Sequence, residues 1–101
     1  MHIENSQLIA LYGNLGSAQP IIDLFIKNSP ELIKDLEKCI MLNAHSQLDD
    51  LCHKLIGQSR YIACKRIEEI AELLPTKSNI EKLNLLDELK IIISEIKHEH
   101  S

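Results

Sequence analysis

Apolar residues recur along most of the chain with the three-to-four-residue spacing of amphipathic α-helices. The pattern predicts a short first helix over about residues 3–14, with Gly13 and Gly16 marking its end. Ser17 is expected to open a second helix, with Pro20 in its first turn. The apolar positions of this helix continue to about residue 41, and Asn28-Ser29-Pro30 could divide it in two.

The rest of the chain predicts three further helices joined by short connections. The third follows a connection at residues 43–46, where Ser46 and Asp49 resemble a capping pattern, and loosens near residues 59–61. The fourth spans about residues 63–74 and stops at residues 75–77. Ser78 and Glu81 form a capping box for the last helix, beyond which residues 98–101 are expected to fray. Its expected inner face consists of Ile80, Leu83, Leu86, Leu89, Ile92, Ile93 and Ile96.

These elements together predict an all-α fold. Amphipathic helices with short loops pack as an antiparallel four-helix bundle, here with a short additional N-terminal helix. The length of 101 residues predicts one domain over residues 1–101. Hydrophobic residues make up 45% of the chain and aromatic residues only 3%, so the core must consist mainly of leucine and isoleucine.

Charge and composition exclude several classes of function. The net charge is −4 and basic residues form no stripe, which argues against a nucleic-acid partner. No apolar run approaches the roughly 18 residues of a membrane span, and residues 1–5 lack the pattern of a signal peptide. A cytoplasmic location is therefore expected. Cys39, Cys52 and Cys64 are odd in number, have no C-x-x-C spacing and are predicted to be mostly inward-facing free thiols.

The third helix separates a core stripe from a histidine stripe. At about 100° per residue, His53, Gly57 and Arg60 lie away from the apolar face, with Asp49 and Asp50 nearby. The apolar face is formed by Leu48, Leu51, Cys52, Leu55, Ser59, Ile62 and Ala63. A mid-helix glycine costs roughly 1 kcal/mol relative to alanine, and one turn after the histidine it opens space beside the imidazole. This arrangement suits a histidine that another protein's active site must reach, although most surface histidines are simply solvated.

The stretch from residue 44 to residue 74 resembles the histidine-containing phosphotransfer (HPt) domain of multistep two-component signalling. The family's core has the approximate pattern Ala-His-x-Leu-Lys-Gly-Ser-Ser, and the chain places His53, Leu55, Gly57 and Ser59 at matching positions. Residues 21–32, which end in Pro-Glu-Leu, resemble the family's second helix and favour one long helix with a bend at residues 28–30. The resemblance covers about residues 17–97.

The resemblance implies that the protein is a phosphorelay intermediate. His53 would accept a phosphoryl group from a receiver-domain aspartate and pass it to another receiver aspartate. The chain would then be a phosphocarrier without autokinase activity. Its expected partners are response-regulator receiver domains and a hybrid histidine kinase. The chain is expected to need no cofactor, because Mg²⁺ would be bound by the receiver, and to be a monomer.

The chain departs from the family pattern at two places. Ile56 occupies the position at which the family usually has a lysine, so Lys54 and Arg60 are the remaining candidates to neutralise phosphoryl charge. The family's glycine after the motif is replaced by Ala63, with an expected effect on close helix packing only.

Several neighbours of the histidine have a less defined expected role. Gln58 and Ser59 could donate hydrogen bonds to the phosphoryl group or orient the ring, although Ser59 falls toward the core. Ile56 could contribute to an apolar patch that contacts a receiver, or could simply be buried.

Two alternatives of other classes follow from the same residues, besides a purely structural helical bundle. A non-catalytic module that docks and sequesters receivers would retain the fold, but it would not need an imidazole. A metal-binding bundle would require Glu-x-x-His motifs on paired helices, and the chain contains none, so no metal site is expected. The donor, the receivers, the signalling output, the direction of net transfer and whether the domain is free-standing or part of a hybrid kinase stay open from the sequence.

Overall fold

The computed structural model describes residues 2–100, which form helices connected by short turns. The helices are α1 (Asn5–Tyr12), α2 (Leu15–Met41), α3 (His45–Tyr61), α4 (Lys65–Leu73) and α5 (Asn79–His100), with a 3₁₀ turn η1 (Leu74–Thr76) after α4. The described residues include no strand. The all-α prediction is therefore confirmed.

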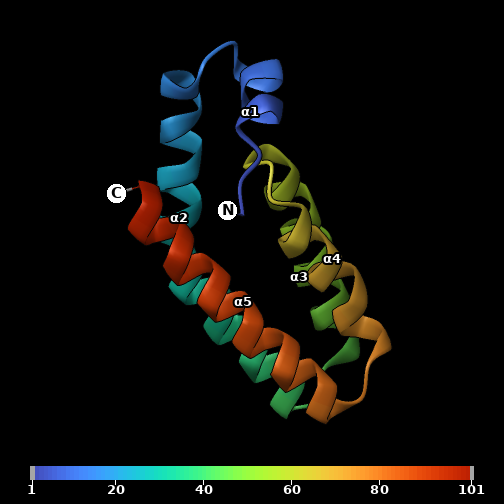
Figure 1. The fold of residues 1–101 in the computed structure, drawn as a ribbon. Helices are drawn as coiled ribbons and strands as arrows, with labels where there is room; N and C mark the ends of the chain where they lie inside the picture. Colours follow the sequence, from blue (N-terminus) through green and yellow to red (C-terminus); the bar gives the residue numbers. More distant parts are fainter. Residues whose placement is uncertain (1, 101) are drawn as a thin grey trace.

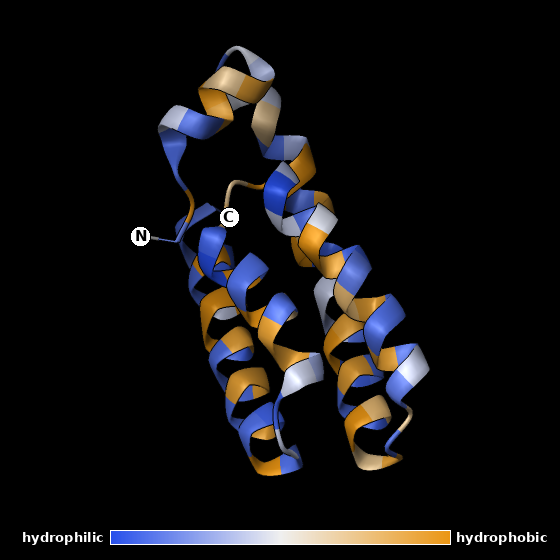
Figure 2. Ribbon diagram, turned by 90° about the vertical axis from the view of Figure 1, so that its right-hand side faces the viewer, coloured by the Kyte–Doolittle hydropathy of each residue, from blue (hydrophilic) through white to orange (hydrophobic). Residues whose placement is uncertain are grey.

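Helices α2, α3, α4 and α5 pack in antiparallel order around one core (Figure 1). Helix α3 packs against α2 and α4, and α5 packs against the same two helices from the opposite corner of the bundle. Figure 2 shows hydrophobic and hydrophilic positions alternating along each helix, as expected for helices with one buried face. The short α1 packs on α2 at one end of the bundle, where the sequence predicts an additional helix.

The second helix begins earlier than the sequence predicts. Asn14 caps α2, because its side-chain oxygen accepts a hydrogen bond of 2.8 Å from the Ser17 backbone N–H. Ser17 therefore lies inside the helix, and the prediction that it opens the helix is wrong. The sharp turn before α2 uses Gly13, whose φ of +85° is a conformation that glycine adopts without strain.

Helix α2 passes through Pro30 without a break, as the family resemblance favours. Proline has no N–H to donate to the carbonyl of Ile26, four residues earlier. The Ser29 hydroxyl instead donates a hydrogen bond of 2.7 Å to that carbonyl. Figure 1 shows α2 bending between its N-terminal part and its longer C-terminal part. Pro30 thus accounts for the bend, and the adjacent Ser29 supplies the hydrogen bond that the Ile26 carbonyl would otherwise lack.

The ends of the later helices confirm one capping prediction and correct another. Ala44 precedes α3 without a side-chain cap, so the predicted role of Ser46 is wrong. Ser78 and Glu81 do form the predicted capping box: the Ser78 hydroxyl donates to Glu81 Oε1 at 2.9 Å, and the Glu81 N–H donates to Ser78 Oγ at 3.3 Å. The Ser78 hydroxyl and the Ser78 backbone N–H both donate to the Glu81 carboxylate and lower its pKa.

Helix α5 begins with its predicted inner face turned outward. Ile80 and Leu83 are 75% and 42% exposed, whereas Lys82 is only 5% exposed. The buried stripe starts at Lys82, whose aliphatic stem covers the core, and continues through the later apolar positions of the prediction. The prediction that residues 98–101 fray is wrong for residues 98–100, which continue the helix, and residue 101 lies outside the described residues. The His100 carbonyl accepts a 2.8 Å hydrogen bond from the Gln19 side chain.

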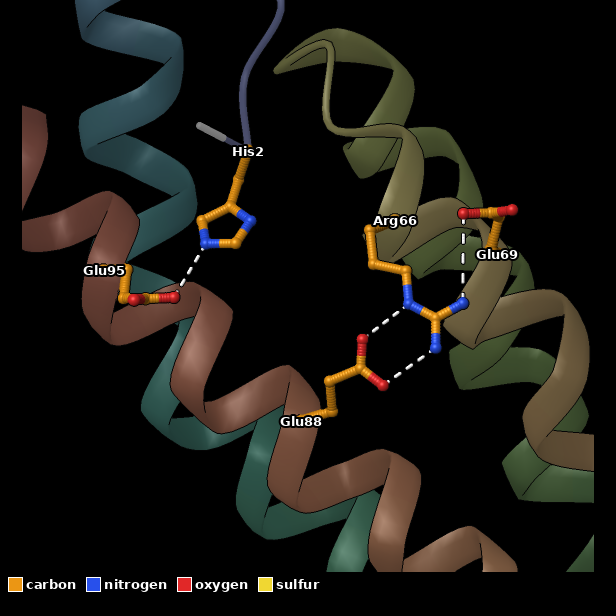
Figure 3. A network of polar contacts seen from close by, with 5 residues as sticks. All are labelled: His2, Arg66, Glu69, Glu88 and Glu95. Carbon is orange, nitrogen blue, oxygen red and sulfur yellow. Dashed lines mark hydrogen bonds and ion pairs between the residues drawn. The ribbon is translucent and has the colours of Figure 1, made fainter.

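Polar contacts connect α5 to the N-terminal segment and to α4 (Figure 3). His2 Nε2 lies 2.7 Å from a carboxylate oxygen of Glu95. Arg66 on α4 donates two hydrogen bonds to Glu88 on α5, one of them 2.8 Å long, and lies 3.9 Å from Glu69. The bidentate contact lowers the pKa of Glu88 and raises that of Arg66.

The Arg66–Glu88 pair predicts a pH-dependent contribution to folding stability. The pKa of Glu88 is lowered, so the contribution is present above its ordinary value of 4.5 and is lost as the pH falls through the folded-state value. Arg66→Gln should lower the free energy of unfolding at pH 7 by no more than about 1 kcal/mol, because both side chains are partly exposed. The measurement is urea unfolding at pH 7 and pH 3.

The matched control for this prediction is Lys97→Gln, which removes an exposed positive charge from α5. Its effect should be small and similar at both pH values. A loss of stability in Arg66→Gln that is as large at pH 3 as at pH 7 would contradict the electrostatic explanation.

Candidate functional site

Helix α3 presents His53 to solvent because the opposite side of the helix is buried. Leu48, Cys52, Leu55 and Ser59 are each at most 2% exposed, and His53 is exposed. Within residues 2–100 the imidazole forms no hydrogen bond or ion pair, so both of its nitrogens are free for a partner. The predicted separation of a core stripe from a histidine stripe is confirmed.

A shallow depression of about 220 Å³ lies beside His53 between α3 and α4. Asp49 and Ile56 line it from α3, and Glu72 lines it from α4. The remaining lining residues are Cys52, Ala71 and Pro75. The small Ala71 on α4 and Pro75 in η1, just after α4 ends at Leu73, leave room next to the ring. The site of His53 is therefore open on the side of α4 and carries two carboxylates there.

Gly57 leaves space one turn after the histidine. A Cβ atom built at this position would meet no heavy atom within 4 Å. The structure therefore gives no packing reason for a glycine here, although glycine is an unfavourable residue inside a helix. The absence of a side chain at Gly57 leaves clearance beside His53 for a partner molecule.

The two candidate cations differ in their surroundings. Arg60 is 64% exposed and directs its guanidinium to Glu68 on α4, with Nη2 and Nε both 3.1 Å from Oε2. Lys54 is exposed, and no ion pair of its side chain is present among the described residues. Arg60 is thus engaged by a carboxylate, whereas the Lys54 ammonium is available, although its stem starts about 100° around the helix from His53.

The other predicted site residues divide between solvent and core. Gln58 is exposed and lines a depression of about 240 Å³ between α3 and α2, together with Leu24, Phe25 and Tyr61. Ile56 is half-buried and packs against the core cluster. Ser59 is buried and donates a 2.6 Å hydrogen bond to the Ile56 carbonyl, so its hydroxyl serves the helix.

The cysteine thiols and the acidic residues offer no other chemistry at this site. Burial raises the pKa of the Cys52 thiol to about 12, so it stays protonated although it neighbours His53 in sequence. Cys64 is also buried and Cys39 half-buried, as predicted, and all three are free thiols. Over residues 2–100, no group of three or more His, Cys, Asp or Glu side chains could hold a metal ion.

The turn from α3 to α4 contains the second departure from the family pattern. Ala63 has a φ of +57°, a left-handed conformation that costs a residue with a Cβ roughly 1–2 kcal/mol. A glycine would adopt it freely. The replacement therefore affects backbone conformation, and the expectation of an effect on helix packing alone is wrong.

The sequence did not reveal the α4 side of the site. Ala71, Glu72 and Pro75 lie about twenty residues after His53, and only the short α3–α4 turn brings them opposite it. The spacing of two antiparallel helices around that turn is the signal from which their position could be predicted. Leu24, on α2, was missed in the same way.

A comparison with known protein families finds a match over most of the chain. The family model of the Hpt domain matches residues 20–99, from the early part of α2 nearly to the end of α5. The chain shows no significant match to the curated proteins or to the solved structures. In the described part of the chain, no helix has the length and apolar composition needed to cross a membrane. The match covers most of the bundle and includes His53 with its surroundings, so the chain belongs to the Hpt domain family, the phosphotransfer-capable histidine modules of two-component signalling.

Proposed function

We propose that His53 is the phosphoacceptor of a phosphorelay and carries the phosphoryl group between aspartates of two receiver domains. The observation that supports this most directly is the exposed imidazole beside the open space at Gly57. A receiver must bring its phosphoaspartate into line with a ring nitrogen, and a side chain at residue 57 would crowd that approach.

The chemistry requires little more from this chain than a presented nucleophile. In a neutral imidazole, the nitrogen without a proton attacks phosphorus while the bond to the aspartate oxygen breaks. Phosphoryl transfer depends mainly on positioning and charge neutralisation, and the receiver would supply Mg²⁺ for the second of these. No autokinase activity is proposed, because a phosphoaspartate already provides the activated phosphoryl group.

Two flanks of His53 are suited to different parts of this encounter. Toward α2, the depression lined by Leu24, Phe25 and Tyr61 offers apolar surface, and both Leu24 and Tyr61 are more than half exposed. Toward α4, the surface is acidic. We propose that a receiver docks over α2 and α3, with Gln58 at the border of the contact, in a complex of one chain with one receiver in the cytoplasm.

A docking module that sequesters receivers without chemistry is the alternative. Ile56 favours it, because an apolar residue packed against the core stands where the family usually supplies a cation. The two functions differ in one outcome: a sequestering module binds receivers but never accepts a phosphoryl group from them.

The first functional prediction concerns the acceptor. The chain should take label from a receiver phosphorylated with radiolabelled acetyl phosphate, and His53→Gln should abolish acid-labile, base-stable label. His45→Gln is the matched control, because His45 is an exposed histidine on the same helix, and it should be labelled like wild type. Label that survives in His53→Gln and disappears in His45→Gln would place the acceptor elsewhere.

The second prediction concerns the space at Gly57. Gly57→Leu should raise the free energy of unfolding by up to about 1 kcal/mol, because leucine is the better helix former and open space surrounds the position. Transfer from the receiver should nevertheless slow strongly, because the side chain enters the approach to His53. Thermal unfolding and rapid-quench transfer rates measure the two effects. Gly57→Ala is the control, with the same gain in stability and a smaller loss of rate; wild-type transfer in Gly57→Leu would refute the steric argument.

The third prediction compares the two cations. Lys54→Ala should slow transfer by about tenfold, equivalent to about 1.4 kcal/mol, whereas Arg60→Ala should have a smaller effect because Glu68 already engages Arg60. Both variants should remain folded, since both side chains are exposed. Stopped-flow transfer rates decide between them. Equal, near-wild-type rates would mean that the receiver supplies all of the positive charge.

A further inference from the structure

The depression beside His53 has an unusual balance of charge for a site that would hold a phosphoryl group. Its lining contains two carboxylates, Asp49 and Glu72, and no lysine or arginine. Asp49 precedes His53 by one helical turn, a spacing that brings two side chains on a helix next to each other. Glu72 approaches from α4, and both acids are exposed.

Neither of the two candidate cations, Lys54 and Arg60, lines the depression. Arg60 is paired with Glu68, and Ile56 contributes no charge on the α4 side of the ring. Lys54 starts about 100° around α3 from His53 and does not line the depression. A phosphoryl group on His53 would therefore have negative neighbours on its α4 side, within a helical bundle that has a net charge of −4.

We propose that Asp49 and Glu72 raise the free energy of phosphorylated His53 and so bias the module toward donating its phosphoryl group to a receiver aspartate. This inference rests on the proposed function of His53 and adds a direction to it. The two carboxylates make no bond to the phosphoryl group. They disfavour its dianionic form through Coulomb repulsion.

The transfer that they favour can be written with its atoms and charges balanced. The bond between phosphorus and the imidazole nitrogen breaks, and its electron pair returns to the ring. A new bond forms between phosphorus and an oxygen of the receiver carboxylate. The other ring nitrogen keeps its proton throughout, so the leaving group is neutral histidine. The negative phosphoryl group thus moves away from Asp49 and Glu72, and the repulsion is relieved.

The size of the effect is limited by exposure to solvent. A charge pair a few ångströms apart at a protein surface interacts far more weakly than in the interior, and salt screens it further. Each carboxylate is expected to shift the transfer equilibrium by about three- to tenfold at low salt. The shift should shrink as salt is added, because the groups are exposed.

The test measures the equilibrium between phosphohistidine and phosphoaspartate with one receiver at low ionic strength. Glu72→Gln and Asp49→Asn should each increase the fraction of phosphohistidine by the stated factor, and the double variant should increase it further. Glu99→Gln is the matched control, because Glu99 is an exposed acid on α5, at the corner of the bundle opposite α3, and it should behave like wild type. The difference in phosphohistidine fraction between Glu72→Gln and wild type should become smaller at high salt.

A second arm removes the receiver. Potassium phosphoramidate phosphorylates histidines directly. After a fixed reaction time close to equilibrium, mass spectrometry gives the fraction of His53 that is phosphorylated. Higher occupancy in Glu72→Gln and Asp49→Asn than in Glu99→Gln supports the proposal, and unchanged or lower occupancy overturns it. Wild-type protein that accepts no label from any phosphoreceiver refutes the proposed relay function, whereas normal labelling with unshifted equilibria in the variants refutes only the bias.

Discussion

The burial of one face of α3 between α2 and α4 determines most of what this protein can do. Leu48 and Leu55 are almost completely buried, and each contributes roughly 1.5–3 kcal/mol through removal from water. Turning α3 by one residue would expose both. Because the helix repeats every 3.6 residues, this burial also sets the direction of His53, which points away from the core. The exposure of the imidazole is thus a consequence of packing on the other side of the helix.

The α3–α4 turn completes the site on one side. Ala63 adopts a left-handed backbone there, and its carbonyl accepts a 3.0 Å hydrogen bond from the Glu4 N–H, so the N-terminal segment braces a strained position. The Cys64 N–H also donates to the Ser59 carbonyl at 2.9 Å, which closes the end of α3. The turn brings α4 back along α3, and Glu72 then lies across the depression from His53.

Helical periodicity predicted the fold and the orientation of α3 well, because burial follows the period wherever a helix has neighbours along its length. It failed at ends. Ile80 and Leu83 belong to the apolar pattern of α5, but they lie in its first turns, and the buried stripe begins instead with the stem of Lys82. Asn14 and Ser17 are both suitable caps, and only the path of the chain after Gly13 decides between them. The α4 side of the site depends on contacts between helices, which one helix's pattern does not contain.

The two flanks of His53 separate two properties that a phosphocarrier must combine. Apolar contact over Leu24 and Tyr61, toward α2, has little dependence on the phosphorylation state, because neither side chain carries charge. In the proposed relay, charge on the α4 flank, from Asp49 and Glu72, would act on the phosphoryl group and hardly at all on an apolar contact. Under this proposal, affinity for a receiver and the direction of transfer would change independently, by substitutions on opposite sides of one exposed helix.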